Sequence, residues 1–221
     1  MTKVFLAGAS RGAGREIAKQ LVINNHSVVA LLRSTQAKAD LEAMGIATAI
    51  GDALDAETVK QAVSEQLPDA VISTIGGLPS DGGTRADFAG NKNLIDAAVA
   101  SQVKRFILIS SIGSGESAKA LPPQALETLG AVLKEKEQAE EYLASSGLTY
   151  TIIRPGGLVS QPATDGEVLT EDAAAAGSIP RAALARLTVK CLSSDRAKNK
   201  TLSAIDTSMQ RSSQDFELFE P

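Results

Sequence analysis

The sequence predicts an α/β fold, with a doubly wound and mostly parallel sheet of about seven strands and helices on both faces. Two observations carry this prediction. Short apolar runs alternate with longer amphipathic runs along most of the chain, and this alternation is typical of βαβ units. Continuous apolar runs such as FILIS (106–110) indicate strands that are covered by helices on both faces.

Length and composition predict one globular domain. The chain has 221 residues, of which 43% are hydrophobic and 22% are charged, and these values suit a single soluble domain. We expect this domain to span residues 1–206 and a C-terminal tail to follow at 207–221. The net charge of −4 and the lone cysteine, Cys191, argue against nucleic acid, membrane surfaces and disulfides, so we expect a cytoplasmic protein.

Each element is predicted from local patterns. Gly45 and Gly147 mark helix ends, and Asp55 and Thr84 mark helix starts. The predicted strands are 3–8, 27–33, 46–51, 70–76, 105–111, 149–155 and 201–205. The predicted helices are 13–24, 35–44, 55–66, 85–101, 124–146 and 180–193.

Two long segments have no clear pattern, 112–123 and 157–180. They follow the fifth and sixth predicted strands, so both emerge at the carboxyl edge of the sheet. Ligands of open α/β sheets bind at this edge. We therefore interpret both segments as substrate loops, and the tail as an edge segment or a partly ordered end.

The first strand ends in a glycine-rich turn, FLAGASRGAGREIA (5–18). Gly8 would allow a sharp turn, Gly12 a close approach of the backbone to a ligand, and Gly14 tight packing of helix on strand. Free N–H groups and the helix dipole attract an anion at such a turn. A plain tight turn is the alternative, but the position after the first strand favours a dinucleotide site.

The end of the second strand discriminates between cofactors. NAD sites place an acid there for the ribose 2′-hydroxyl, whereas NADP sites carry a cation for the 2′-phosphate. This chain has Arg33 at that place and Arg11 in the glycine turn, which favours NADPH. Arg33 as an ordinary solvated residue is the alternative. Asp52 is either an acceptor for the adenine amino group or a cap for the next helix.

The residues that could support chemistry are few. The only histidine, His26, is expected at the far end of the first helix, and metal-binding clusters of histidine and cysteine are absent from the sequence. Ser110 and Ser111 end the fifth strand, where a nicotinamide and its substrate would meet, or else they only form a turn. Lys136 lies on the predicted sheet-facing stripe formed by Leu129, Leu133, Glu140 and Leu143. It could donate to the nicotinamide ribose or only extend its ammonium to the edge.

The motifs together resemble the short-chain dehydrogenase/reductase superfamily, in its atypical, NmrA-like NAD(P)-binding branch. The matching motifs, in order, are GASRGAGR, GDALD, DAVISTIGG, NLIDAAVASQVKRFILISSIG, EEYLASSGLTYTIIRPGGL and IPRAALARLTVKCL. The last two, with SQPATDGEV (160–168), are most similar to the flavin reductase and biliverdin-IXβ reductase group.

The resemblance implies a Rossmann-type domain that binds NADPH, a serine at Ser110 or Ser111 near the hydride path, and a monomer rather than a dimer. Ser111, Ser110 and Lys136 are the candidate catalytic residues. The candidate cofactor-binding residues are Gly8, Ser10, Arg11, Gly12, Gly14, Arg33, Asp52, Ala53, Gly76, Lys136, Pro155 and Gly156.

One departure from the family pattern narrows the chemistry. Superfamily dehydrogenases use Tyr-x-x-x-Lys, and with Lys136 as the lysine the tyrosine position holds Val132. A simple ketone needs a proton donor at its oxygen, whereas a flavin, linear tetrapyrrole or quinone spreads the incoming charge over a conjugated system. We therefore expect an NADPH-dependent reductase of such an acceptor. A non-enzymatic NADP(H) sensor or assembly protein is the alternative, and an epimerase or dehydratase of a nucleotide-linked substrate is a third possibility.

Overall fold

The structure, a computed structural model, describes residues 1–77, 84–212 and 215–221. Its main sheet has eight strands in the order β3-β2-β1-β4-β5-β6-β10-β8, and all of them are parallel except β8, which runs antiparallel to β10. The strands of this sheet are β1 (Lys3–Ala7), β2 (Ser27–Leu32), β3 (Ala47–Ile50), β4 (Ala70–Ser73), β5 (Arg105–Ile109), β6 (Tyr150–Pro155), β8 (Glu167–Thr170) and β10 (Lys200–Asp206).

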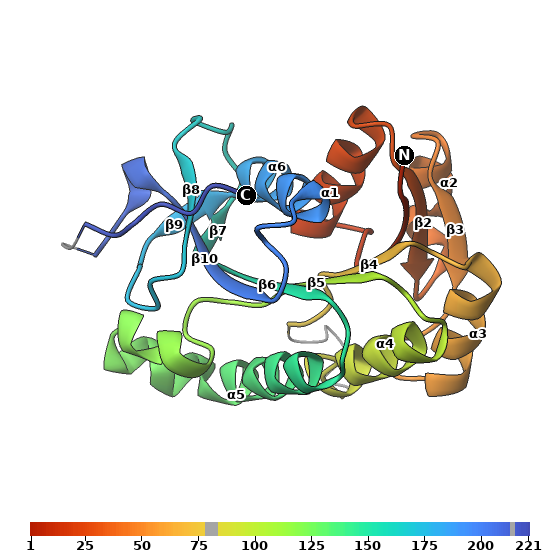
Figure 1. The fold of residues 1–221 in the computed structure, drawn as a ribbon, viewed down its shortest axis with the longest axis horizontal. Coiled ribbons are helices and arrows are strands. Elements are labelled where there is room, and N and C mark those ends of the chain that lie inside the picture. Colours follow the sequence, from red (N-terminus) through yellow and green to blue (C-terminus); the bar gives the residue numbers. More distant parts are fainter. Residues whose placement is uncertain (78–83, 213–214) are drawn as a thin grey trace.

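Helices cover both faces of the sheet (Figure 1). α1 and α6 pack side by side on one face, and α3 packs against α4 on the other face, where α5 also lies. The helices are α1 (Gly12–Ile23), α2 (Lys38–Glu42), α3 (Ala56–Gln66), α4 (Ala89–Ala100), α5 (Pro123–Ser145) and α6 (Arg181–Ser193).

The alternation of side chains along the strands explains the two cores. Val4 and Leu6 of β1 belong to the core under α1 and α6, whereas Phe5 and Ala7 belong to the core under α3, α4 and α5. Successive strand residues point to opposite faces, so an uninterrupted apolar strand supplies both cores. The doubly wound Rossmann-type fold predicted from the sequence is thus confirmed.

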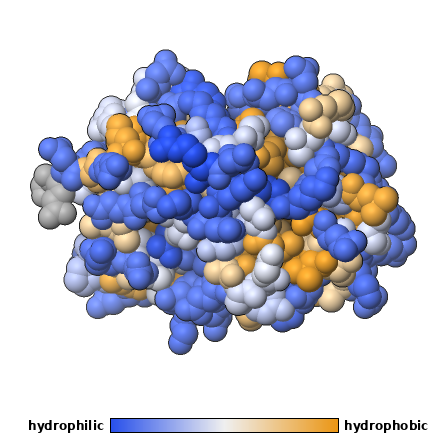
Figure 2. All heavy atoms as spheres, viewed as in Figure 1, coloured by the Kyte–Doolittle hydropathy of each residue, from blue (hydrophilic) through white to orange (hydrophobic). Residues whose placement is uncertain are grey.

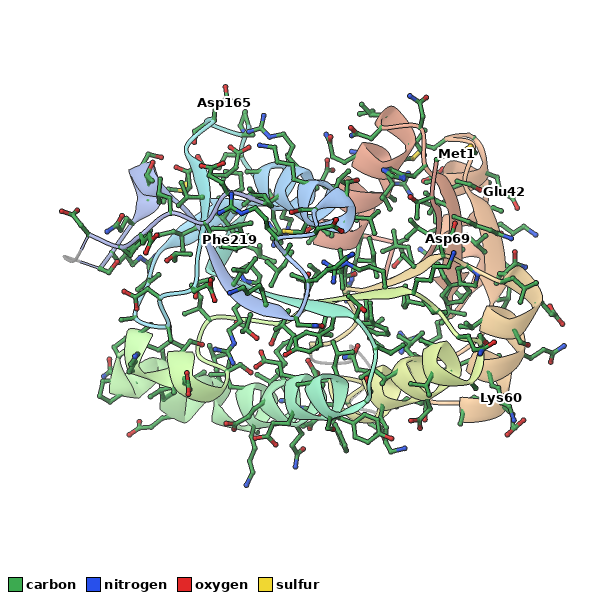
Figure 3. All side chains as sticks on the ribbon, viewed as in Figure 1. Met1, Glu42, Lys60, Asp69, Asp165 and Phe219 are labelled. Atoms are coloured by element: carbon green, nitrogen blue, oxygen red, sulfur yellow. The ribbon has the colours of Figure 1, made fainter. Side chains whose placement is uncertain are left out.

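The seven predicted strands are all present, and three further strands lie in the segment 157–180. β7 (Gly157–Val159) and β9 (Ser178–Pro180) pair in parallel as a small second sheet, and β8 extends the main sheet. Asp165 lies at the tip of the loop between β7 and β8 (Figure 3) and pairs with Arg186 of α6 at 2.8 Å. The other predicted substrate loop, 112–123, contains a 3₁₀ helix at Gly115–Ala120.

Two local predictions are wrong. The helix expected at 85–101 begins only at Ala89, and Thr84 does not cap it. Leu129 was expected on the buried stripe of α5 but is 42% exposed. The first buried residue of this helix is Leu133, so its first turns do not pack onto the sheet.

The C-terminal tail covers the edge strand β8. The backbone N–H of Phe219 donates to the carbonyl oxygen of Leu169 at 2.7 Å, and the Phe219 ring lies 5.6 Å from the guanidinium carbon of Arg196. Figure 3 labels Phe219 in this position. Residues 213–214 of the predicted tail lie outside the described part of the chain.

The face seen in Figure 2 is largely hydrophilic, with hydrophobic residues in small groups. Among the described residues, no helix has the length and apolar character needed to cross a bilayer. In the same part of the chain, no group of three or more His, Cys, Asp or Glu side chains could hold a metal ion.

Candidate cofactor and substrate site

The strand order reverses between β1 and β4. The chain passes from β1 to β2 on one side, while β4 pairs with the other side of β1. Ligands of open α/β sheets bind in the crevice beyond such a reversal, at the carboxyl ends of the strands. The glycine turn follows β1, and the segment from Thr74 to Gly77 follows β4, so both lie at this crevice.

The glycine turn depends on residues without a side chain. Gly8 and Gly12 have positive φ angles of 94° and 58°, which L side chains rarely adopt. A Cβ on Gly14 would lie 2.1 Å from the carbonyl oxygen of Gly8, and a Cβ on Gly8 would lie 2.3 Å from Oγ1 of Thr74. Gly8 and Gly14 therefore have no room for a side chain, because the start of α1 packs tightly against the turn.

The first turn of α1 offers free donors for an anion. Its N-cap residue, Arg11, makes no side-chain cap hydrogen bond, and the first turn contains no acidic residue. The first backbone N–H groups of a helix have no partner within the helix. These observations fit a nicotinamide dinucleotide, whose diphosphate would be held at the glycine turn.

Arg33 and Arg11 are both exposed and form no ion pair with a described residue. Ser10 is exposed beside them. Arg15, by contrast, pairs with Asp40 at 3.7 Å. Two arginines of this corner thus remain available for a phosphate.

Asp52 and Ala53 follow β3 at the same edge. The Oδ1 atom of Asp52 accepts a hydrogen bond from the backbone N–H of Leu54 at 2.9 Å, and Asn93 donates to the Ala53 carbonyl. The cap of α3 is Asp55, which accepts from the backbone N–H groups of Glu57 and Thr58. The alternative in which Asp52 caps that helix is therefore wrong, while its contact with adenine stays a prediction.

Lys136 lies beside Gly76, but its charge has a partner that the sequence analysis missed. Its Nζ atom is 3.2 Å from Oδ1 of Asp87, a fully buried carboxylate. Asp87 also accepts from the backbone N–H of Gly77 at 3.0 Å. The pair therefore joins α5 to the segment after β4 and leaves an ammonium with further donors at the crevice.

The two serines after β5 have different surroundings. Ser110 is buried and donates to the carboxylate of Glu140. Ser111 is half-buried and donates to the neighbouring carbonyl of Ile112 at 2.9 Å. Of the two hydroxyls, that of Ser111 is the better placed to turn toward a ligand.

Glu140 also binds Arg154, the residue before Pro155. The Arg154 Nε atom donates to Oε1 of Glu140 at 3.1 Å, and both side chains are nearly buried. A Cβ on Gly115, at the start of the 3₁₀ helix, would lie 2.9 Å from Nη2 of Arg154. The Arg154–Glu140 pair therefore packs against the start of the 3₁₀ helix in the first substrate loop.

Pro155 ends β6 and Gly156 follows it at the same edge. The backbone N–H of Gly156 donates to the carbonyl of Ala204, and a Cβ on Gly156 would lie 2.4 Å from the carbonyl oxygen of Gly177. Close packing against the second substrate loop thus accounts for this glycine. Its contact with a cofactor stays a prediction.

The edge also contains Arg181, which the sequence analysis did not single out. A Cβ on Gly12 would lie 3.8 Å from its Nε atom, and its Nη1 atom donates to Oγ of Ser160 at 2.8 Å. The sequence signal was its position as the first residue after the second loop. The predicted position of His26 is confirmed, since it follows the end of α1 that is remote from the glycine turn. Burial and the nearby N-terminal ammonium lower the pKa of its imidazole.

Comparison with known proteins agrees with this geometry. Residues 8–195 match a family described as NAD(P)H-binding. An uncharacterized sugar epimerase, YhfK, of Bacillus subtilis is 33% identical over 202 residues, covering 90% of this chain and 91% of that protein. Sanguinarine reductase of Eschscholzia californica is 35% identical over 162 residues, covering 66% of this chain and 55% of that enzyme.

Among solved structures, ChuY, an anaerobillin reductase from Escherichia coli O157:H7, is similar with a TM-score of 0.86 and 30% identity, covering 96% of this chain and 100% of that chain. The fold, the glycine turn and these matches together show that the chain belongs to the NAD(P)H-binding family, in the atypical branch of the short-chain dehydrogenases/reductases.

Proposed function

We propose that this chain is an NADPH-dependent reductase that acts on a conjugated acceptor, namely a flavin, a linear tetrapyrrole or a quinone. The observation that carries the proposal is on α5. Val132, one turn before Lys136, occupies the position that holds a tyrosine in the family pattern. In addition, the charge of Lys136 is paired with Asp87. This arrangement suits an acceptor whose own conjugation stabilises the added charge.

In this proposal, each group of residues binds a different part of the cofactor. The backbone N–H groups of the glycine turn hold the diphosphate, and Arg33 with Arg11 holds the 2′-phosphate. Lys136 donates to the nicotinamide ribose, while Asp87 keeps its ammonium in place. When bound, NADPH supplies a hydride for the acceptor.

The acceptor would lie between the two substrate loops, next to Ser111. The Ser111 hydroxyl can donate to an acceptor oxygen or nitrogen and so orient the acceptor against the nicotinamide. Positioning of this kind contributes to the rate without a dedicated acid or base. Two of the similar proteins are named as reductases, of anaerobillin and of sanguinarine, which supports reduction as the reaction class.

The test mixes the purified protein with NADPH and one acceptor from each class, FMN, biliverdin or menadione. Loss of the nicotinamide absorbance at a rate proportional to protein concentration is expected with at least one of them. The control is the same mixture with heat-denatured protein. NADPH binding without turnover of any acceptor would contradict the proposal and favour a sensor or assembly role.

A further inference from the structure

Arg181 is held over the glycine turn by the small β7–β9 sheet. It is the first residue of α6 and directly follows β9, whose partner strand β7 leads to Ser160. The hydrogen bond from Nη1 of Arg181 to Oγ of Ser160 measures 2.8 Å. The Arg181 side chain is thus attached to the helix at its backbone and to the loop at its guanidinium. Its Nε atom lies close to Gly12, since a Cβ built on Gly12 would be 3.8 Å away.

The charge of Arg181 is not balanced by the surrounding protein. Arg186, five residues further along α6, pairs with Asp165 and with Glu167. Arg181 forms no ion pair with any residue that the structure describes. The first turns of α1 and α6, which lie next to each other, contain no acidic residue.

A guanidinium beside the glycine turn that has no ion-pair partner among the described residues favours an anion. Guanidinium groups bind phosphate oxygens through charge-assisted hydrogen bonds with fixed geometry. The dinucleotide diphosphate is the anion that the proposed function places at Gly12. Arg33, at the end of β2, is on the opposite side of β1 from β4 and serves the 2′-phosphate in that proposal.

We propose that Arg181 binds the cofactor diphosphate from the side of the second substrate loop, with Ser160 orienting its guanidinium. This inference rests on the proposed assignment of the glycine turn as the nucleotide site. It divides recognition between two arginines: Arg181 serves every nicotinamide dinucleotide, and Arg33 serves only those with a 2′-phosphate. Because Arg181 is hydrogen-bonded to Ser160, its contact with the diphosphate would also connect cofactor binding to the loop 157–180.

Equilibrium binding of three probes tests this division. NADPH carries both the diphosphate and the 2′-phosphate, NADH carries the diphosphate alone, and adenosine 2′-monophosphate carries the 2′-phosphate alone. Each is titrated by calorimetry into the wild type, Arg181→Gln, Arg33→Gln and the control Lys190→Gln. Lys190 is an exposed cation in the last turn of α6, away from the crevice.

Arg181→Gln is expected to weaken NADPH and NADH alike, by about tenfold, and to leave adenosine 2′-monophosphate unchanged. Arg33→Gln should weaken NADPH and adenosine 2′-monophosphate but not NADH, and Lys190→Gln should change none of the three. Wild-type affinity of Arg181→Gln for both dinucleotides would overturn the inference. An equal loss with all three probes would also overturn it, because that pattern indicates general damage to the site.

Two more variants keep the test decisive if Arg181→Gln folds poorly. Arg181→Lys retains the charge and should recover part of the dinucleotide affinity, and Ser160→Ala should weaken both dinucleotides by a smaller factor. If neither variant alters dinucleotide affinity, the inference fails. Binding with the expected pattern but no acceptor turnover would leave the inference standing and contradict the proposed reductase function, so the two failures are distinguishable.

Discussion

At the scale of single residues, the arginines of the crevice differ in what they contact. Arg154 is buried against Glu140, and Arg15 reaches Asp40. Arg33 and Arg181 have no ion-pair partner in the described part of the chain. A charge already paired within the protein contributes little to an incoming phosphate, so the unpaired arginines are the ones that we propose for phosphate binding.

Ser111→Ala should lower kcat for acceptor reduction by about tenfold, because one hydrogen bond to the acceptor in the transition state is lost. The affinity for NADPH should remain within about twofold of wild type. Steady-state kinetics and calorimetry measure the two effects. Ser145→Ala removes an exposed hydroxyl at the far end of α5 and serves as the control. An unchanged kcat in Ser111→Ala would mean that Ser111 only forms the turn and does not contact the acceptor.

Cys191 should be inert in the native protein. Burial raises the pKa of its thiol to about 12, and only the thiolate reacts with thiol reagents. A disulfide reagent at mildly alkaline pH should label unfolded protein rapidly and native protein only at the rate of unfolding.

The same shift predicts a loss of stability at alkaline pH. The unfolded thiol titrates near 9.0, below the native value of about 12, so the unfolded state loses its proton first as pH rises. The contribution of Cys191 is fully present below pH 9.0 and falls between the two values, by about 1.4 kcal/mol per pH unit. Denaturant unfolding of wild type and Cys191→Ala at several pH values checks this, since the variant should lack this part of the slope.

At the scale of elements, α5 combines a structural and a functional role on one stripe. Lys136 lies beside Gly76 and pairs with Asp87, and one turn later along the helix the buried Glu140 joins Ser110 to Arg154. Because Arg154 is at the end of β6 and near Gly115, this network fixes the distance between the helix, the sheet and the first substrate loop. Packing of α5 and placement of the candidate site are therefore coupled.

Glu140→Ala should lower the free energy of unfolding by about 3 to 5 kcal/mol, because it leaves the Arg154 guanidinium nearly buried without a counterion. Glu141→Ala, on the exposed side of the same helix, should change it by less than about 0.5 kcal/mol. The double variant Glu140→Leu with Arg154→Met should recover much of the loss. Urea unfolding followed by circular dichroism gives these values. A Glu140→Ala variant as stable as wild type would show that the pair is not structural.

At the scale of the whole molecule, the interior of the sheet and its β8 edge have separate roles. The reversal between β1 and β4, inside the sheet, creates the crevice, whereas the tail covers β8 at one edge of the sheet. An uncovered edge strand exposes unpaired backbone groups that promote association. The tail contact at Leu169 therefore protects the fold at a distance from the cofactor site.

Deletion of residues 215–221 should lower the free energy of unfolding by about 1 to 2 kcal/mol, since it removes the Phe219 contacts with Leu169 and Arg196. The Kd for NADPH should stay within about twofold of wild type. Phe219→Ala, which keeps the backbone hydrogen bond, should give a smaller loss. A weakened Kd in the truncated chain would mean that the tail reaches the crevice.

Local patterns were sufficient for much of the fold. Asp55 caps α3, and Gly45 and Gly147 have positive φ angles of 79° and 82° at helix ends. These features depend on neighbouring residues alone, so the sequence predicts them. The start of α4 was mispredicted at Thr84, because the chain before Ala89 is held in a loop. In this loop Asp87 turns inward to meet Lys136 and Gly77, which are contacts that no local pattern indicates.

The amino-acid sequence alone was enough to predict the alternation of strands and helices and the glycine turn, and it assigns Arg33, Ser111 and Lys136 to the carboxyl edge of the sheet. Those conclusions follow from periodicity and from the rule that parallel strands end at one edge. The pairing of Asp87 with Lys136 and the position of Arg181 beside Gly12, by contrast, became visible only in the folded protein. Such pairs form between segments that are distant in the chain, and strand order and helix packing, which no local pattern encodes, set their distances.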